Sequence, residues 1–251
     1  MKRRSALLAL LGIFVLAAGC GDPQAVNDFT IARVMNALVG IPNNANVDFV
    51  SSRSVQTAQN VAYGGISPYV QGPYGAANVT VNTTGTQTVL AGPTSISPTP
   101  LKNNTIVVSG VVGGQGALAP RIFDITDTIP ANSGGGQTTV IRLVNLSPDS
   151  GAIDLYYATA IPTAQAPALP LIGLTTITYG HASDYVIVPT GTNNFVYLEI
   201  RDHVTGQVIP TPILNRGFFS VSGKAYTVFA MGLQNPGAGQ QAFDAVVSLD
   251  N

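Results

Sequence analysis

The sequence contains little charge. Lys, Arg, Asp and Glu make up 9% of its 251 residues and leave a formal net charge of −1. An ordinary soluble domain carries about 25% charged residues. A weakly charged chain without basic clusters lacks the positive surface that binds nucleic acid or anionic lipid headgroups. We therefore expect no nucleic-acid partner and no electrostatic attachment to a membrane.

Residues that ligate metals or act as nucleophiles and bases are few. The chain has one cysteine, Cys20, and two histidines, His181 and His203. A zinc site needs roughly three or four His, Cys or carboxylate ligands, and a serine hydrolase needs a serine, a base and a group that orients the base. Neither set is recognisable, and no G-x-S-x-G motif occurs. The sequence therefore predicts no catalytic residue, no bound metal and no cofactor.

Most carboxylates are interpreted as structural. A glycosidase needs two carboxylates that face a cleft, whereas Asp48 and Asp154 recur at matched places between apolar neighbours and are expected on the solvent face of a strand. The segment SPDSGAID places Asp149, Ser150 and Asp154 near one turn. Calcium takes about six to eight oxygen ligands, and such a segment is commonly an Asx-turn. Calcium therefore stays an alternative to the prediction of no metal.

One apolar run stands apart from the rest of the chain. Residues 6–19 are apolar or small and follow Lys2, Arg3 and Arg4, which is the arrangement of a secretory signal peptide. The run is shorter than the ~18 to 20 residues that a membrane-spanning helix needs. It ends at Cys20 in the sequence LAAGC, which resembles the lipobox of bacterial lipoproteins. In that family a diacylglycerol is attached to the thiol and the chain is cut just before the cysteine.

The lipobox resemblance implies that Cys20 carries lipid and becomes the new N-terminus. We therefore divide this region into a signal peptide, residues 1–19, and a short tether, residues 20–28. Two or more acyl chains hold a protein firmly on a membrane. Gly21 rather than Asp follows the cysteine, which by the same resemblance favours the outer membrane or periplasmic face of a Gram-negative cell. An ordinary signal peptide that happens to contain a cysteine is the alternative.

Two stretches more than a hundred residues apart share one pattern, and that distance is the size of a domain. Asn60–Gly75 (NVAYGGISPYVQGPYG) matches Thr176–Gly191 (TITYGHASDYVIVPTG) without a gap. Four shorter pairs of segments occur in the same order in both copies. Two precede the matched stretch, Ile31–Asn36 with Val140–Asn145 and Asn46–Val50 with Ala152–Tyr156, and two come after it, Thr105–Gly110 with Thr227–Gly232 and Arg121–Asp127 with Gln241–Val247. We predict two domain copies, residues 29–130 and 139–251, joined by a Gly-rich linker at residues 131–138.

Each copy is expected to be all-β. Asn193–Asp202 alternates apolar and polar residues with the period of a half-buried strand. Gly and Pro turns recur about every ten residues, which is typical of an antiparallel β-sandwich. Within the matched stretch, Tyr185 is predicted to pack in or at the rim of the core. Gly191 is predicted to occupy a turn with positive φ.

The matched stretch differs at two positions of chemical interest. His181 and Asp184 in the second copy stand where the first copy has Gly65 and Pro68. One hypothesis is that they form a binding spot, half of a metal site, or a base with its orienting carboxylate. The other, which we favour, is an exposed polar pair on a loop, because no partner nucleophile or third ligand is visible.

A family resemblance supports the domain assignment. Thr138–Tyr157 (TTVIRLVNLSPDSGAIDLYY) resembles the opening of domain-of-unknown-function family 4397, and Lys224–Gly232 (KAYTVFAMG) resembles a later segment of it. Members occur in bacterial envelope proteins, often as tandem copies. The resemblance implies two tandem Ig-like or transthyretin-like sandwiches on an exported protein, and it implies no activity.

Together these observations predict a lipid-anchored bacterial envelope protein that serves as a non-catalytic structural, adhesion or ligand-binding module. Its partners would be the membrane, through the lipid, and an unidentified envelope protein or glycan. An envelope hydrolase or metal-dependent enzyme with an unrecognised site is the alternative function.

Overall fold

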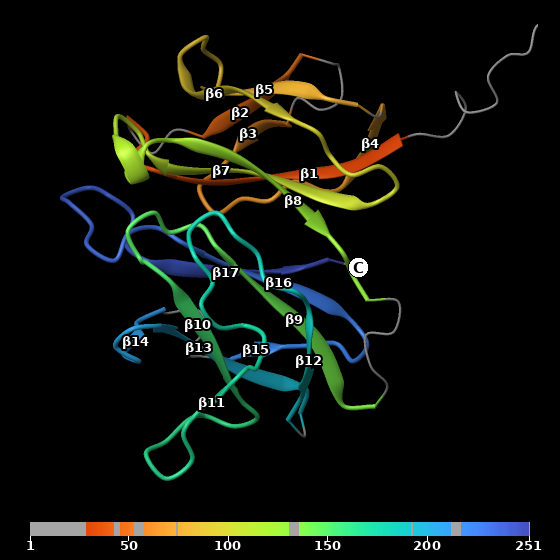
Figure 1. Cartoon of the computed structure of the whole chain (residues 1–251), viewed down its shortest axis with the longest axis vertical. Coiled ribbons are helices and arrows are strands. Elements are labelled where there is room, and N and C mark those ends of the chain that lie inside the picture. Colours follow the sequence, from red (N-terminus) through yellow and green to blue (C-terminus); the bar gives the residue numbers. More distant parts are fainter. Residues whose placement is uncertain are drawn as a thin grey trace, which may run out of the picture.

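The computed structural model describes residues 29–42, 46–52, 58–73, 75–130, 136–191, 193–211 and 217–250 (Figure 1). The predicted signal peptide, Cys20 and the tether lie outside the described residues, as do residues 131–135 of the predicted linker. The part of the chain that is described folds into strands, turns and a short 3₁₀ helix, η3 (Gly116–Leu118). None of its helices is long and apolar enough to cross a membrane.

The first half of the chain forms two facing sheets. Their strands are β1 (Phe29–Val39), β2 (Val47–Ser51), β3 (Ala58–Val61), β4 (Val70–Pro73), β5 (Ala77–Thr83), β6 (Val89–Ile96), β7 (Asn103–Val111) and β8 (Arg121–Asp127). One sheet has the order β4-β1-β7-β8 and the other β3-β2-β5-β6. Apolar side chains from both sheets form one core, which includes Val34, Phe49, Val81 and Val108. This half is therefore a β-sandwich, which we call the first sandwich.

The second half repeats this arrangement. Its strands are β9 (Thr138–Asn145), β10 (Ile153–Ala158), β11 (Leu169–Pro170), β12 (Val186–Pro189), β13 (Phe195–Asp202), β14 (Val208–Ile209), β15 (Phe218–Phe219), β16 (Ala225–Met231) and β17 (Asp244–Leu249). The sheets have the orders β12-β9-β16-β17 and β11-β10-β13-β14, with β15 beside β13. Leu143, Leu155, Leu198 and Val228 belong to its core. We call this half the second sandwich.

The all-β sandwich prediction is confirmed, with one addition. β1 pairs with β7 in parallel, and β9 pairs with β16 in parallel, while the other strand pairs of the described residues are antiparallel. Parallel neighbours need a long crossover connection. Here the crossover is the other sheet, because β2, β3, β5 and β6 lie between β1 and β7 in the sequence.

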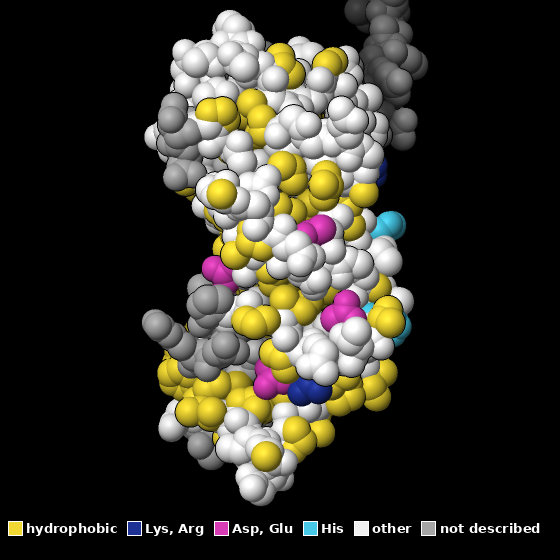
Figure 2. Space-filling model, turned by 90° about the vertical axis from the view of Figure 1, so that its left-hand side faces the viewer, with side chains coloured by type: hydrophobic (Ala, Val, Ile, Leu, Met, Phe, Trp, Pro, Cys, Tyr) yellow, Lys and Arg dark blue, Asp and Glu magenta, His cyan; other side chains and the backbone are white. Residues whose placement is uncertain are grey.

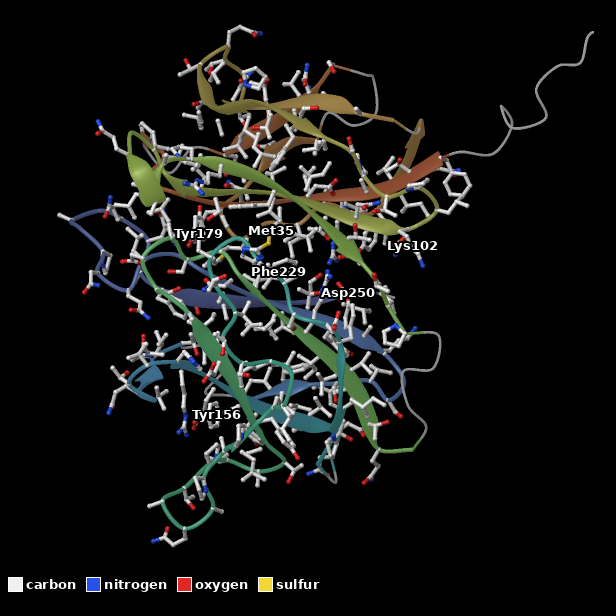
Figure 3. All side chains as sticks on the ribbon, viewed as in Figure 1. Met35, Lys102, Tyr156, Tyr179, Phe229 and Asp250 are labelled. Carbon is white, nitrogen blue, oxygen red and sulfur yellow. The ribbon has the colours of Figure 1, made fainter. Side chains whose placement is uncertain are left out.

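The two sandwiches stack on each other through the sheets that contain β1 and β9 (Figure 1). All seven residues of β16 are buried, as are eight of the nine residues of β7. Both faces of these strands are covered, one by the core of their own sandwich and the other by the neighbouring sandwich. Met35, Val107, Val144, Phe229 and Met231 form an apolar layer between the sandwiches. In Figure 3, Met35 and Phe229 lie between the upper and lower halves.

One sequence expectation about the matched stretch needs correction. Gly191 does not have positive φ. A Cβ atom at Gly191 would lie 2.5 Å from the carbonyl oxygen of Thr159, so the position requires glycine because of a close backbone approach. The glycines of the stretch that do adopt positive φ include Gly64 and Gly180, at +71° and +79°.

The sequence match of Arg121–Asp127 with Gln241–Val247 differs by three residues from the register of the strands in the structure. Thr105 of β7 pairs with Ile125 of β8, and Thr227 of β16 pairs with Ser248 of β17. The register therefore places Asp127 in the position that Asp250 occupies in the second sandwich. The sequence comparison aligned the phenylalanines and missed this correspondence.

Candidate functional site

Two arginines cross between the sandwiches in a reciprocal exchange. Arg33 lies on β1 of the first sandwich, and its Nη2 donates to Asp250 Oδ1 of the second sandwich at 2.6 Å. Arg142 lies on β9 of the second sandwich, and its Nη2 donates to Asp127 Oδ1 of the first. All four side chains are at most 2% exposed. Each sandwich therefore neutralises a buried carboxylate of the other, an arrangement that we call the arginine exchange.

The partners of each arginine recur as well. Arg33 Nε donates to Thr105 Oγ1, and Arg142 Nε donates to Thr227 Oγ1. The guanidinium of Arg33 lies 4.6 Å from the ring centroid of Tyr69. These contacts fix the planar guanidinium on more than one side, which is where arginine is more effective than lysine.

Two tyrosines complete the arginine exchange. Tyr69 donates its hydroxyl proton to Asp127 Oδ2 at 2.5 Å, and Tyr185 donates to Asp250 Oδ2 at 2.8 Å. The ring of Tyr185 lies 4.8 Å from the guanidinium of Arg142. Tyr185 was predicted in or at the rim of the core. In the structure its half-buried ring covers the ion pair of Arg142 between the sandwiches.

Buried charge explains the titration behaviour of these groups. Burial alone would lower the pKa of Arg142, but the nearby Asp127 carboxylate outweighs it and the pKa is raised. Burial and the neighbouring aspartates raise the pKa of Tyr69, and burial is the largest cause of the raised pKa of Tyr185. The arginine therefore stays charged and the tyrosines stay neutral. We interpret the arginine exchange as structural, because its charged groups are buried and hydrogen-bonded to one another.

The loops that carry the matched stretch make the same backbone contacts in both sandwiches. Asn36 N donates to Gly65 O in the first, and Asn145 N donates to His181 O in the second. Ser67 Oγ accepts from Val34 N, as Ser183 Oγ accepts from Leu143 N. The two loops therefore differ in sequence but have the same backbone hydrogen bonds.

A cavity of about 300 Å³ opens between the sandwiches beside the arginine exchange. We call it the interface cavity. It is lined by residues of β8 and its C-terminal flank, by Arg142, and by the loop before β12: Asp124, Ile125, Thr126, Thr128, Arg142, Gly180, His181, Ala182, Ser183, Asp184 and Tyr185. The sequence candidates His181 and Asp184 therefore lie in one cavity, and both are exposed. Neither side chain makes a hydrogen bond or ion pair with another described residue.

Asp124 is the residue of this cavity that the sequence did not single out. Its Oδ1 atom is buried and has no hydrogen-bond partner among the described residues. Burial, with a smaller contribution from Asp127, raises the pKa of Asp124 to about 6. The carboxyl group is therefore largely ionised at neutral pH while one of its oxygens lacks a donor.

A second and larger hollow, of about 580 Å³, lies on the open side of the second sandwich. We call it the open-edge groove. Ile209, Leu233 and Phe243 are buried apolar residues that line it. Its other lining residues are mostly polar or exposed: Asp202, Thr205, Gln207, Val208, Pro210, Gln234, Asn235, Pro236 and Ala242. Figure 2 shows a face of the molecule on which few side chains are charged.

The groove offers neutral hydrogen-bonding groups. The side-chain amides of Gln207, Gln234 and Asn235 make no hydrogen bond with another described residue. Asp202 accepts from Thr205 N at 2.7 Å and from Thr205 Oγ1 at 2.8 Å. These bonds lower the pKa of Asp202 and hold its carboxylate within a turn.

The predicted solvent exposure is wrong for Asp154, which is buried, whereas Asp48 is partly exposed; both carboxylates are hydrogen-bonded. Asp48 accepts from Asn60 N and Gly85 N, and Asp154 accepts from Thr176 N at 2.7 Å. Although burial opposes the change, these bonds lower the pKa of Asp48. Each aspartate holds a residue with φ near +60°, Asn60 or Thr176. The alternation of the strand pattern hid this role, because a side chain at the strand edge can turn back to cap a loop.

The residues considered for calcium are engaged separately. Asp149 accepts from Gln234 N and Asn235 N, and Ser150 Oγ bonds to Asn145. Asp154 contacts the ring of His203, with 2.9 Å between Oδ1 and Nδ1. Within the described ranges no group of three His, Cys, Asp or Glu side chains is placed to hold a metal ion.

Residues 32–156 match the family model of DUF4397, a domain of unknown function. The match spans the first sandwich and continues into β10. No curated protein matches the chain.

Three solved structures are similar at low identity. A streptococcal virulence factor described as binding alpha-glucan is 15% identical, with 81% of this chain and 92% of that chain covered and a TM-score of 0.27. A DUF3823 family protein from Bacteroides ovatus is 10% identical over 68% and 88%, with a TM-score of 0.20. A cell-adhesion candidate from Bacteroides eggerthii is 10% identical over 89% and 96%, with a TM-score of 0.21. TM-scores this low support no conclusion about function.

Proposed function

We propose that this protein is a lipid-anchored, extracytoplasmic binding module without catalytic activity, and that the open-edge groove of its second sandwich holds a neutral, hydroxyl-rich ligand such as a glycan. The observation that carries the proposal is the groove itself. It combines an apolar floor with unbonded amide side chains on its rim. An apolar surface with a few polar groups is the usual composition of a ligand site.

The chemistry of the rim favours a neutral ligand. Amide side chains donate and accept hydrogen bonds at once, which suits hydroxyl groups that do the same. Gln207, Gln234 and Asn235 supply these amides, and Asp202 is the one carboxylate among the described lining residues. Among the described residues that line the groove there is no lysine or arginine, which favours a neutral ligand over a phosphate or a carboxylate.

A lipid anchor at Cys20 would determine which sandwich lies farther from the membrane. About eight residues separate Cys20 from β1, and at ~3.4 Å per residue they reach ~27 Å when fully extended. A lipid on Cys20 would therefore keep the first sandwich close to the membrane. The second sandwich, which carries the groove, follows it in the chain and lies at the opposite end of the molecule in Figure 1.

The absence of catalysis is part of the proposal. Among the described residues, the one histidine paired with a carboxylate is His203, with Asp154. Asp154 holds the Thr176 amide just as Asp48 holds the Asn60 amide in a sandwich that has no histidine there. This equivalence favours a structural role for Asp154. It speaks against the alternative function of an envelope hydrolase.

The anchor is tested with a Cys20→Ser variant. We expect it to lose labelling by a fatty-acid analogue and to leave the membrane fraction. Membrane retention equal to that of the unmodified protein would reject the anchor and leave the groove proposal untouched.

The groove is tested on an array of neutral oligosaccharides with the full-length protein in detergent. We expect binding that a Gln207→Ala, Gln234→Ala and Asn235→Ala triple variant lowers by about tenfold or more, since each lost hydrogen bond contributes about 1 kcal/mol. The matched control replaces two exposed glutamines of the first sandwich, Gln87 and Gln115, by alanine. Equal binding by both variants, or no binding by the unmodified protein, would reject the proposal.

A further inference from the structure

The second sandwich carries four aromatic side chains on the sheet face that points away from its core, and we call them the aromatic platform. They come from the neighbouring strands β10, β13 and β15: Tyr156, Phe195, Tyr197 and Phe219. Successive side chains of a strand point to opposite faces, and the adjacent Tyr157, Val196 and Phe218 pack into the core. In Figure 3, Tyr156 lies in the lower half of the molecule, away from the interface between the sandwiches.

The rings of the aromatic platform are exposed and contact one another. Phe195 and Phe219 are 38% and 58% exposed and meet edge-on, with 5.9 Å between their centroids. Phe195 also stacks on Tyr197, with 6.4 Å between the centroids and 28° between the planes. The backbone approaches Tyr197 at Gly217, where a Cβ atom would lie 2.9 Å from the ring. Rings held in this way are ordered before a ligand arrives, which lowers the entropic cost of binding.

The aromatic platform is continuous with the open-edge groove. Tyr156 lies diagonally across from Tyr197 in the register of β10 and β13, and the Arg201 guanidinium lies 4.2 Å from the Tyr156 centroid. Arg201 pairs across the strands with Val208, which lines the groove and is partly covered by solvent. Arg201 also bonds to Glu199 at 2.7 Å, so these two charges compensate each other. One largely apolar surface therefore leads from the rings into the groove.

The first sandwich builds the same face without aromatic residues. Phe49 pairs with Val81 as Leu155 pairs with Ile200. Counted from these pairs, Tyr156 corresponds to Val50, Phe195 to Ala76 and Tyr197 to Asn78. All three first-sandwich residues are exposed. The fold therefore does not require rings on this face, and a contiguous exposed apolar patch marks an interaction site.

We propose that the aromatic platform and the open-edge groove together form a binding path for a polymeric neutral glycan, whose sugar rings stack on the aromatic side chains. This inference rests on the proposed function and names its ligand class, a chain of several sugar residues. One face of a pyranose ring carries C–H groups, which pack against the electron-rich face of an aromatic ring. From Phe195 to Arg201, β13 extends over about 20 Å at ~3.3 Å per residue, which is longer than a single sugar residue.

Two features favour a glycan over a lipid surface. The hydroxyl groups of Tyr156 and Tyr197 make no hydrogen bond with another described residue, and a glycan supplies hydroxyl groups that donate to them and accept from them. The compensated pair of Glu199 and Arg201 gives no net positive charge that would attract anionic lipid headgroups.

The test is affinity electrophoresis of the full-length protein in detergent, in native gels that contain dextran, laminarin or galactomannan. Fragments of the polymer that retards the protein are then titrated calorimetrically. We expect the fragment of six sugar residues to bind at least about tenfold more tightly than the fragment of two, because the longer chain reaches from the groove onto the aromatic platform.

Variants separate stacking from simple apolar contact. Phe195→Leu with Phe219→Leu keeps apolar side chains without rings, and it should remove the advantage of the longer fragment while the shorter fragment binds as before. Phe219→Trp keeps a ring and should preserve the advantage. The matched control is Leu101→Ala with Leu118→Ala, which shortens two first-sandwich side chains of similar exposure, 60% and 38%, and should bind both fragments as the unmodified protein does.

The outcomes distinguish this inference from the groove proposal. Equal affinity for the two fragments, or an unchanged advantage in the double leucine variant, would overturn the aromatic platform and leave the groove standing. Binding of both fragments that the triple alanine variant of the groove leaves unchanged would reject the groove and with it the continuous path. Retardation by none of the three polymers would also overturn the inference. Self-association in ultracentrifugation that the double leucine variant loses would assign the aromatic platform to a second copy of the chain and overturn it as well.

Discussion

The first sandwich is closed along the side on which the second sandwich is open. In the first, β6 has eight residues and lies against β8, so the two sheets meet at this side. In the second, the strand in the place of β6 is β14, which has two residues, Val208 and Ile209. The same strand order is thus compatible with a closed and an open side. The groove is therefore a property of the residues around β14 and not of the fold.

At the interface between the sandwiches, in contrast, the two sandwiches are alike. Its arginines, threonines, aspartates and tyrosines match one for one, and their hydrogen bonds recur. Buried ion pairs of this kind are costly to break, because removing one partner leaves an uncompensated charge. We expect little tolerance for change in the arginine exchange and wide tolerance outside it. The following predictions test that division, from the largest effect to the smallest.

Replacing either arginine should have the largest effect. Arg33→Met leaves Asp250 without its ion pair, and Arg142→Met does the same to Asp127, so each should lower the free energy of unfolding by about 3 to 5 kcal/mol. Urea unfolding followed by circular dichroism measures the loss. Lys102→Met removes an exposed positive charge and should stay within about 0.5 kcal/mol of the unmodified protein. A large loss in one arginine variant alone would contradict the symmetry of the exchange.

The matched glycines should differ in their tolerance. Gly64 and Gly180 both have positive φ, so alanine at either costs about 1 to 2 kcal/mol. A Cβ at Gly180 would also overlap the ring of Phe123, which packs edge-on against Tyr179, whereas a Cβ at Gly64 meets the flexible end of Met231. Overpacking adds about 1 to 3 kcal/mol. Gly180→Ala should therefore unfold at lower urea concentration than Gly64→Ala, and the reverse order would refute this account.

The tyrosine hydroxyls should contribute equally on the two sides. Tyr69→Phe and Tyr185→Phe keep the ring over the arginine and remove a hydrogen bond to a buried carboxylate, which should cost about 1.5 kcal/mol each. Tyr156, whose ring also lies over an arginine but whose hydroxyl bonds to no other described residue, is the control. Tyr156→Phe should change stability by less than about 0.5 kcal/mol. Thermal unfolding of the three variants side by side would show whether the hydroxyl or the ring matters.

The smallest expected change is a gain. Asp124→Asn removes a buried carboxylate that has an unbonded oxygen and lies near Asp127, so stability at neutral pH should rise by about 1 kcal/mol. The folded-state pKa of about 6 exceeds the ordinary value of 3.8. The folded protein therefore binds a proton first on acidification, and this group's penalty, full above pH 6, is relieved as the pH falls toward four. The advantage of the variant should shrink over the same interval; an advantage that does not change with pH would exclude ionised Asp124 as its cause.

The fold class could be predicted from the sequence because strand periodicity and turn residues involve only residues close together in the chain. The alternation in Phe195–Asp202 and the Gly and Pro turns sufficed for an all-β sandwich. The parallel neighbours β1 with β7 and β9 with β16 join strands far apart in the chain, and no local pattern reports them.

The candidate site was predictable only in part. His181 and Asp184 stood out because their counterparts in the matched stretch are Gly65 and Pro68. Asp124 did not, since the sequence comparison was three residues out of register there. The groove depends on the short length of β14, which becomes visible only when the opposite sheet is in place. Cys20 stays a prediction, as it lies outside the described residues.

The arginine exchange has the geometry of a symmetric dimer built within one polypeptide. In a dimer of identical chains, each substitution would appear twice, on both sides of the two-fold axis. In one chain a substitution appears once, so Asp124 can occupy one side of the interface while the corresponding position on the other side keeps Val247. Covalent connection also makes the encounter of the halves independent of protein concentration. The two sides of the interface are thereby free to differ from each other, while both sandwiches still contribute equally to the arginine exchange.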